Sequence, residues 1–281
     1  MVTVGTALRA ATSALDGSES AALDAQLLLA SVLGKSRSWL YTWPEQLLAA
    51  SSARDFEGLV RRRAAGEPVA YLVGSREFWS LPLRVSPAVL IPRPETETLV
   101  RAVLDLLPTG RQRVADLGTG SGAIALALAS ERPQWELHAT DCSQEALQQA
   151  QDNVRALGLT VQLHLGDWLE ALPDSRFDAL VSNPPYLADS DPHLQQGDLR
   201  FEPRSALVAA DDGHGDLNRL AAAAPAHLGE GGWLLLEHGW QQGGAVRTLL
   251  RARGFVAIQT RCDEGGRERV TQAQWPGAAH G

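Results

Sequence analysis

The tetrapeptide Asn183-Pro184-Pro185-Tyr186 ends an apolar run of the sequence. Proline has no backbone N–H and a fixed φ, and it keeps the residue before it extended. The tetrapeptide therefore cannot continue a strand. It holds two hydrogen-bond acceptors, the side-chain oxygen of Asn183 and the carbonyl oxygen of Pro184, beside an aromatic ring. Such stiffness favours a ligand site over a plain loop.

A glycine-rich stretch, Asp116 to Gly122, follows another apolar run. Glycines let a backbone approach a ligand closely and adopt positive φ, and the helix predicted to begin here offers free N–H groups. The spacing G-x-G-x-G differs from the dinucleotide pattern G-x-G-x-x-G, and the stretch has no Walker lysine. We therefore expect a ligand-binding turn without a triphosphate cradle, formed by Gly118, Thr119, Gly120, Ser121 and Gly122.

Acidic residues recur at the ends of the next two predicted strands. Asp141 lies about 20 residues after the glycine turn, where a carboxylate can accept both hydroxyls of a ribose. Asp167 and Trp168 follow the third strand and can contact an adenine ring, Asp167 by a hydrogen bond and Trp168 by its face. A helix-capping aspartate and a core tryptophan are the structural alternatives. Together with the glycine turn, these residues predict a nucleoside pocket.

The elements that must position these residues alternate between strand and helix from about residue 111 onward. Apolar strand-like runs precede each candidate residue, and helical patterns separate the runs. This alternation predicts an α/β fold with a mostly parallel sheet and helices on both faces. Ligands of such sheets bind beyond the carboxyl ends of the strands, where all the candidates fall. Strands are expected at 113–117, 135–140, 161–165, 177–182, 231–239, 256–260 and 269–274.

Residues 1 to about 75 show helical patterns only. One helix should end at Gly34, and another, in 51–68, should be capped by Ser52 and closed by Gly66 and Pro68. The basic run 61–63 is interpreted as a solvated helix end. A β-hairpin is expected within 76–91, with its turn at Ser80-Leu81-Pro82, and Pro94 should begin a helix.

The bulk composition describes a globular chain of 281 residues with 44% hydrophobic residues. A net charge of −8 disfavours broad binding to nucleic-acid phosphates. We find neither an apolar run of membrane-spanning length nor a signal peptide at the start, so we expect a cytoplasmic protein. Cys142 and Cys262 are far apart and lack metal-type spacing, which predicts two reduced thiols.

The nucleoside pocket and the strand order resemble class I S-adenosylmethionine-dependent methyltransferases, which have a Rossmann-like, mostly parallel seven-stranded sheet. The tetrapeptide 183–186 is similar to the motif of enzymes that methylate a planar amino or amide nitrogen. Such a nitrogen is a poor nucleophile because its lone pair is delocalised. Two fixed acceptors would orient it and stabilise its developing positive charge. The motif alone permits adenine N6 in DNA, guanine N2 in RNA and glutamine N5 in protein.

Longer segments of the sequence favour glutamine N5 in protein over the two nucleic-acid acceptors. Residues 76–97, 116–128, 183–213 and 234–243 resemble the PrmC/HemK family, the glutamine-N5 methyltransferases of bacterial peptide chain release factors, and the resemblance covers essentially the whole chain. It implies a helical substrate-recognition domain (1–75), a β-hairpin linker (76–92) and a methyltransferase domain (93–281). The substrate would be the glutamine of a Gly-Gly-Gln loop, and the protein would be a monomer that binds neither nucleic acid nor membrane.

The resemblance also implies roles for the candidate residues. S-adenosylmethionine would be lined by Gly118, Thr119, Gly120, Ser121, Gly122, Asp141, Asp167, Trp168 and Asn183. The glutamine would be held by Asn183, Pro184, Pro185 and Tyr186. No metal and no general base are required, and His193 and His238 are expected to be structural or surface residues. Arg93, Glu95 and the loop 200–204 are expected to support the pocket, to contact a partner or to form surface and interdomain salt bridges.

Two other functions remain compatible with these patterns. A nucleic-acid amino-methyltransferase would use the same tetrapeptide, although the acidic composition and the lack of a target-recognition domain argue against it. A nucleoside-binding module without catalysis would use the pocket, but it would have no need of the tetrapeptide at 183–186.

Overall fold

The computed structural model describes residues 2–277, which form two compact units. One unit comprises Met1–Ser75 together with His193–Phe201, and the other comprises Arg76–Pro192 and Glu202–Gly281. The grouping of 193–201 with the helical residues was not indicated by the sequence. Each unit has its own hydrophobic core.

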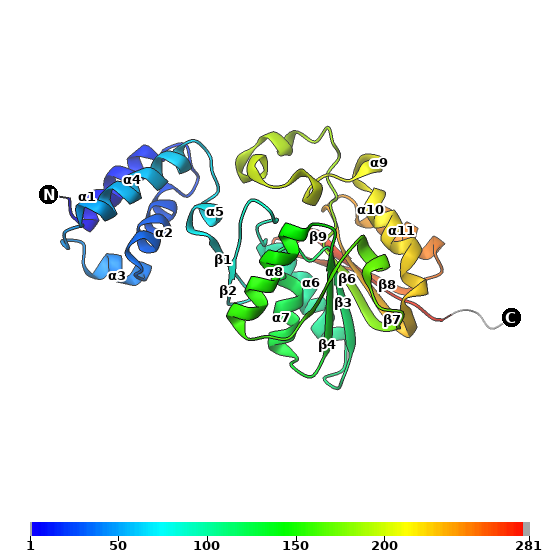
Figure 1. Ribbon diagram of the computed structural model, residues 1–281. Helices are drawn as coiled ribbons and strands as arrows, with labels where there is room; N and C mark the ends of the chain where they lie inside the picture. The colour runs from blue at the N-terminus through cyan, green and yellow to red at the C-terminus, as the bar shows by residue number, and fades with distance from the viewer. Residues whose placement is uncertain (1, 278–281) are drawn as a thin grey trace. The chain divides into compact units, whose positions relative to one another are not determined.

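The helical unit is built from five α-helices of the N-terminal part (Figure 1). Leu28, Leu29 and Phe56 are almost fully buried in its core. The predicted helix end at Gly34 is confirmed, because this residue adopts a left-handed conformation with φ of 59° after α2. The predicted cap at Ser52 is wrong. The helix begins at Ala50, and Ala49 occupies the cap position. The helices are α1 (Val4–Ala14), α2 (Ala21–Leu33), α3 (Arg37–Thr42), α4 (Ala50–Ala64) and α5 (Val69–Val73).

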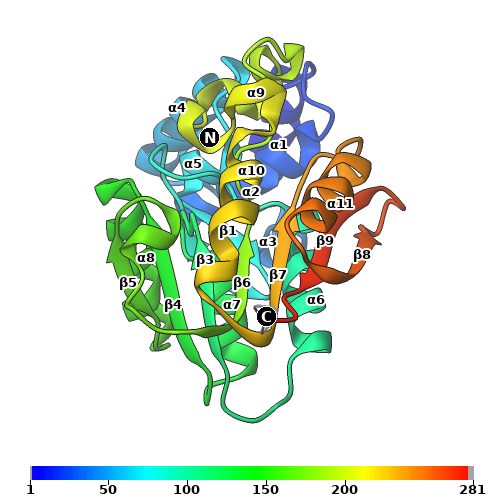
Figure 2. The ribbon, with the colours of Figure 1, turned by 90° about the vertical axis from the view of Figure 1, so that its right-hand side faces the viewer.

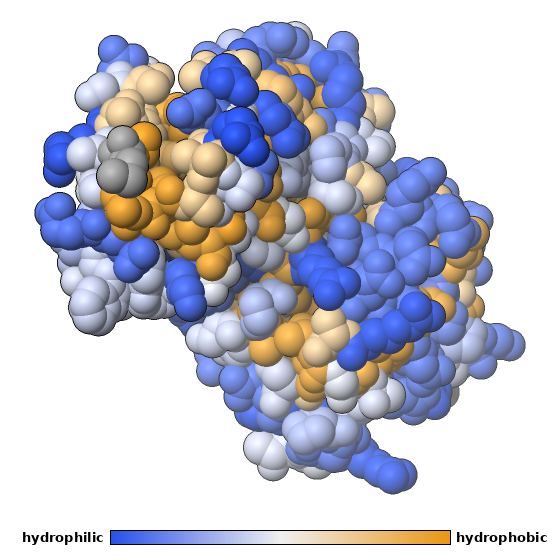
Figure 3. Space-filling model, turned by 60° about the vertical axis from the view of Figure 1, so that its left-hand side comes forward, coloured by the Kyte–Doolittle hydropathy of each residue, from blue (hydrophilic) through white to orange (hydrophobic). Residues whose placement is uncertain are grey.

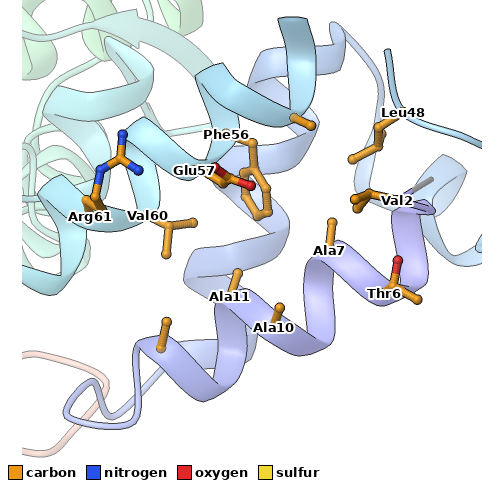
Figure 4. A pocket seen from close by; sticks show the side chains of 12 residues that line it. Val2, Thr6, Ala7, Ala10, Ala11, Leu48, Phe56, Glu57, Val60 and Arg61 are labelled. Atoms are coloured by element: carbon orange, nitrogen blue, oxygen red, sulfur yellow. The ribbon is translucent and has the colours of Figure 1, made fainter. Parts of the chain in front are cut away.

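The surface of the helical unit carries exposed apolar side chains (Figure 3). A groove of about 560 Å³ runs between α1 and α4, and Figure 4 shows small side chains of α1 facing Phe56 and Val60 of α4. Its polar lining includes Glu57 and Arg61. This groove contains none of the predicted site residues.

The second unit contains a seven-stranded sheet in the order β5-β4-β3-β6-β7-β9-β8. Neighbours from β5 to β7 are parallel, whereas β9 is antiparallel to both β7 and β8. The predicted α/β fold with a mostly parallel seven-stranded sheet is therefore confirmed. The strands are β3 (Arg113–Leu117), β4 (Glu136–Asp141), β5 (Gln162–Leu165), β6 (Phe177–Ser182), β7 (Leu228–Glu237), β8 (Val256–Cys262) and β9 (Glu268–Gln274).

Helices cover both faces of this sheet (Figure 2). Adjacent residues of a strand point to opposite faces, so Val114 joins the core under α6 and α7 while Ala115 joins the core under α10 and α11. Ser143 caps α8 and Gly158 ends it, as predicted. The helices are α6 (Glu97–Leu106), α7 (Ala123–Glu131), α8 (Gln144–Leu157), α9 (Ala210–Gly213), α10 (Gly215–Ala223) and α11 (Gly243–Ala252).

Six short 3-10 helices lie in the connections of the described chain. They are η1 (Pro94–Thr96), η2 (Trp168–Ala171), η3 (Pro192–Gln195), η4 (Gly197–Phe201), η5 (Arg204–Ala206) and η6 (Ala224–Ala226). Pro94 occupies the first position of η1, as the sequence predicted. The residues of η1 and the first turn of α6 then lead into the site described below.

The β-hairpin is formed by β1 (Ser75–Phe78) and β2 (Leu81–Arg84). Its turn consists of Trp79 and Ser80, with φ of 52° and 58°. The predicted turn at Ser80-Leu81-Pro82 is therefore wrong by one residue. A two-residue turn with positive φ matches the twist of a hairpin, and it leaves Pro82 inside β2.

Candidate active site

The strand register brings the predicted residues to one edge of the sheet. Leu117 is paired with Thr140 of β4 and with Ser182 of β6, and Ser182 is paired with Leu236 of β7. The carboxyl ends of four parallel strands therefore meet side by side. The chain order reverses between β3 and β6, which is the switch point where ligands of open α/β sheets bind.

The glycine turn is fixed to the end of β4. Gly118 and Thr119 both donate their backbone N–H to the carbonyl oxygen of Thr140, at 2.9 Å each. Gly118, Gly120 and Gly122 have φ values of 73°, 55° and 85°, which favour glycine. A Cβ atom on Gly118 would lie 2.7 Å from the ring of Trp168, so the backbone there must remain bare. The turn thus offers backbone surface to a ligand.

Asp116 is a fully buried carboxylate at the base of the turn. Its Oδ2 accepts hydrogen bonds from Thr119 Oγ1 at 2.6 Å and from the Ala125 N–H at 3.2 Å. Its Oδ1 has no hydrogen-bond partner among residues 2–277. Burial, with a smaller contribution from the charge of Asp141, raises the pKa of Asp116 to about 7. A buried carboxylate with an unused oxygen suits a cationic group of a ligand.

Asp141 lies at the end of β4 and orders both neighbouring loops. Its Oδ2 accepts the N–H of Gly120 and its Oδ1 accepts the N–H of Ser143, both at 2.9 Å. Each carboxylate oxygen can accept a second hydrogen bond. Asp141 can therefore hold the two loops and still accept ribose hydroxyls.

Trp168 and Asp167 are positioned by α10. The Trp168 side chain hydrogen-bonds Asp216, and its ring lies against Gly118. Trp168 has φ of 46°, a conformation that a bulky residue adopts only where its surroundings hold it. The Asp167 carboxylate forms an ion pair with Arg219. The structure thus brings Trp168 to the glycine turn, and it gives Asp167 a protein partner that the sequence did not indicate.

The tetrapeptide 183–186 follows β6 directly. Pro184 and Pro185 are buried, whereas Asn183 and Tyr186 are partly exposed. The Asn183 Nδ2 donates to Thr96 Oγ1 at 3.2 Å. Burial is the main cause that raises the pKa of the Tyr186 hydroxyl, with the charge of Glu237 second, so this group stays neutral.

The backbone of the tetrapeptide is fixed from a second side. Gln242 Nε2 donates to the carbonyl oxygens of Tyr186 and Gly213, both at 3.2 Å, and Gln242 Oε1 accepts the Gly239 N–H at 2.8 Å. A Cβ atom on Gly213 would collide with the Tyr186 carbonyl. Gln242 thereby joins the loops that contain Tyr186, Gly213 and Gly239.

Sequence reasoning missed several residues of this site. Thr96, Gly213, Glu237 and Gln242 were not singled out, and Asp116 was quoted only as the start of the turn. Glu237 is the last residue of the apolar strand β7, and Asp116 is the last but one residue of the apolar strand β3. An acidic residue at the end of a buried strand is a sequence pattern that could have indicated both. The contacts of Thr96 and Gln242 had no sequence signal.

The arginines and histidines whose roles the sequence left open are placed as follows. Arg93 forms an ion pair with Glu202, whose side chain is fully buried, and Arg204 forms one with Asp189. His238 is buried and its Nε2 lies 2.8 Å from Thr271 Oγ1, whereas His193 lies exposed in η3. Across residues 2–277 there is no group of three or more His, Cys, Asp or Glu that could hold a metal ion.

Two further features bear on the sequence predictions. Cys142 and Cys262 are both free and exposed. None of the described helices combines the length and apolar character needed to span a bilayer.

Comparisons with known proteins cover both units. The family description "PrmC N-terminal domain" matches residues 6–74, and "Methyltransferase small domain" matches residues 96–198. Proteins named release factor glutamine methyltransferase are similar over nearly their whole length. The one from Vibrio cholerae is 50% identical, with 98% of this chain and 97% of that protein covered. The one from Escherichia coli is 49% identical, with 95% and 97% covered.

Solved structures share the fold of the sheet unit. A methyltransferase from Pyrococcus furiosus is 18% identical, with a TM-score of 0.54, over 70% of this chain and 89% of that one. A T. thermophilus 16S rRNA methyltransferase in complex with AdoMet and guanosine is 24% identical, with a TM-score of 0.53, over 71% and 49%. At such identities the likeness concerns the fold alone.

Proposed function

The chain belongs to the release factor glutamine methyltransferase family, and from this premise we propose that it methylates the glutamine of the Gly-Gly-Gln motif of bacterial release factors. The methyl group comes from S-adenosylmethionine, and the acceptor is the side-chain amide nitrogen N5. The observation that carries the proposal is similarity over both units, near 50% identity, together with the rigid tetrapeptide at the switch point of the sheet.

The residues at the strand ends fit S-adenosylmethionine. Its ammonium group suits the unused buried oxygen of Asp116, its ribose suits Asp141, and its adenine suits the ring of Trp168. The bare backbone of Gly118 to Gly122 leaves room for close approach. When bound, the cofactor supplies an electrophilic methyl group on its sulfonium.

Asn183 and Pro184 are proposed to orient the substrate amide. Its two N–H groups donate to Asn183 Oδ1 and to the Pro184 carbonyl oxygen, and the Tyr186 ring packs on the planar group. These acceptors hold the nitrogen for attack and stabilise the positive charge that develops on it. The nitrogen gains the methyl carbon and loses one proton to solvent, so no protein base is needed. The bond between the methyl carbon and sulfur would break at the same time, with S-adenosylhomocysteine as the leaving group.

The helical unit, which matches the family description "PrmC N-terminal domain" over residues 6–74, is proposed to be the substrate-recognition domain. It would bind the release factor outside the Gly-Gly-Gln loop. We further propose that the protein acts as a monomer in the cytoplasm without direct contact to nucleic acid.

The intact mass of a bacterial release factor, measured before and after incubation with the protein and S-adenosylmethionine, tests the function. We expect a gain of one methyl group, which peptide fragmentation places on the glutamine of the Gly-Gly-Gln motif. A release factor with this glutamine replaced by alanine is the control and should gain no mass. An unchanged mass, or methyl label appearing in DNA or RNA, would contradict the proposal.

A further inference from the structure

The side-chain amide of Asn183 can point in two ways, and only one of them suits the proposed reaction. With its oxygen toward the substrate, it accepts an N–H of the glutamine amide. With its NH₂ group there, two donors would face each other and the substrate nitrogen would be repelled. Rigid neighbouring prolines fix the backbone but do not determine which way this amide points. Some other group must do so.

Thr96 contacts the other side of this amide. It ends η1, has 4% of its surface exposed, and its Oγ1 lies 3.2 Å from Asn183 Nδ2. The Thr96 side chain also hydrogen-bonds the carboxyl group of Glu237, whose pKa is raised to about 7 by burial. Above this pH the group is an ionised carboxylate, which can only accept hydrogen bonds. The proton of the Thr96 hydroxyl is therefore directed at Glu237.

A threonine hydroxyl has one proton to donate and lone pairs to accept. Since Glu237 takes the proton, Thr96 can offer only a lone pair to Asn183, which must then present its NH₂ group. We infer that Thr96 and Glu237 are positioning residues that lock the Asn183 amide with its oxygen toward the substrate nitrogen. The inference rests on the proposed function for its purpose, although the orientation itself can be observed without it.

Glu237, Thr96 and Asn183 form a relay of hydrogen bonds, and Glu237 is the fixed end of this relay. It ends β7, has 1% of its surface exposed, and lies near the charges of Arg269 on β9, of Arg93 before η1 and of Glu95 within η1. Its charge also contributes, after burial, to the raised pKa of the Tyr186 hydroxyl. Its Oε2 has no hydrogen-bond partner within residues 2–277. The end of a buried strand thus holds the Glu237 carboxylate in place. This carboxylate accepts the Thr96 proton, and Thr96 is left to accept a hydrogen bond from Asn183.

A matched pair of variants separates the hydroxyl of Thr96 from its packing. Thr96→Val keeps the shape and loses the hydroxyl, whereas Thr96→Ser keeps the hydroxyl and loses a methyl group. We expect Val to lower kcat about 10-fold or more, because the acceptor is no longer oriented, and Ser to retain most of the activity. Purely structural packing would give the opposite order. Thr98→Val, which changes a buried threonine of α6 outside the relay, is the control.

Glu237→Gln gives a second readout. A glutamine can donate or accept, so it no longer dictates the direction of the Thr96 proton. In the unaltered protein, burial raises the pKa of Glu237 to about 7, and kcat at saturating cofactor should fall as the pH falls through this value. In Glu237→Gln, kcat should be low and should lack this acidic limb. A variant with the kcat and pH profile of the unaltered protein would overturn the inference.

The orientation can also be measured without any turnover. The chain has only three asparagines, Asn153, Asn183 and Asn218, so selective ¹⁵N-asparagine labelling yields three assignable side-chain NH₂ groups. We expect the Asn183 NH₂ to be protected from solvent exchange, and Thr96→Val to remove that protection while Thr98→Val does not. An unprotected NH₂ overturns the relay. A protected NH₂ in a protein that leaves release factors unmethylated overturns the proposed function instead.

Discussion

Asn183 provides the one side-chain acceptor that the substrate amide would meet, since Pro184 contributes through its backbone. Asn183→Ala removes this acceptor and leaves the prolines in place. We expect turnover to fall about 10²-fold or more, by analogy with the loss of one oxyanion-hole donor. Steady-state kinetics on a release factor would measure it, and calorimetry would give the cofactor affinity, which should fall less. Equal losses in both would show that Asn183 mainly binds cofactor.

The ionisation of Asp116 makes the free energy of unfolding depend on pH. Its pKa is raised from 3.8 to about 7 in the folded protein, so the stability present at pH 4 is lost as the pH rises toward 7 and stays lost above it. Asp116→Asn should remove a cost on the order of 4 kcal/mol at pH 8 and almost none at pH 4. Thermal unfolding of the cofactor-free protein at both pH values measures the difference. Equal changes in Tm at pH 4 and pH 8 would contradict this assignment.

The positions of the candidate residues were predictable where they lie within a short motif. Asn183 to Tyr186, Gly118 to Gly122 and Asp141 were recognised from residue type and spacing, and the structure brings them to one sheet edge. Thr96 was not recognised, because its partner is 87 positions away and the hydrogen bond exists only in the folded chain. Roles that depend on such distant contacts have no local pattern.

At the scale of the elements, the strands and helices of the sheet unit followed from apolar runs and helical spacing, and the central strands β3 and β6 are buried along most of their length. The errors lie at boundaries. Ser52 has the chemistry of a cap, yet α4 already begins at Ala50. The hairpin turn fell on Trp79 and Ser80, although Leu81-Pro82 looked more turn-like, because the twist of the two strands selects positive φ. Backbone geometry outweighed residue preference in the turn.

The loop at Gly213 should be essential to the tetrapeptide, and a comparison with Gly197 tests this. Both glycines have positive φ, of 84° and 51°, so alanine strains either one. Only at Gly213 would the new Cβ also collide with a backbone oxygen, that of Tyr186. We expect Gly213→Ala to lower kcat at least about 10-fold, since a displaced tetrapeptide misplaces its acceptors.

Gly197→Ala should change kcat by less than about 3-fold, because no atom lies within 4 Å of the added Cβ. Methylation kinetics of the two variants, with Tm measured alongside, make the comparison. Equal losses of kcat would mean that backbone strain alone, and not the collision with Tyr186, explains the effect.

At the scale of the whole molecule, the chain is not divided at a single point. Residues 193–201 group with the helical residues although they follow the tetrapeptide in sequence. Arg63 explains part of this grouping, because its guanidinium forms ion pairs with Asp24 of α2, at 2.8 Å, and with Asp198, at 3.1 Å. From the sequence, Arg63 belonged to a basic run interpreted as a solvated helix end. Its side chain is instead only 16% exposed.

Arg63→Ala should therefore loosen the segment 193–201. The variant removes the side chain that joins this segment to α2 through two aspartates, and it leaves Asp24 buried with only the hydroxyls of Ser18 and Ser20. We expect amide hydrogen exchange in peptides covering 193–201 to speed up about 10-fold or more, with little change in the sheet. Mass spectrometry after deuterium labelling measures both. Arg61→Ala, at an exposed position two residues earlier, is the control, and an equal effect of the two variants would show that Arg63 does not hold the segment.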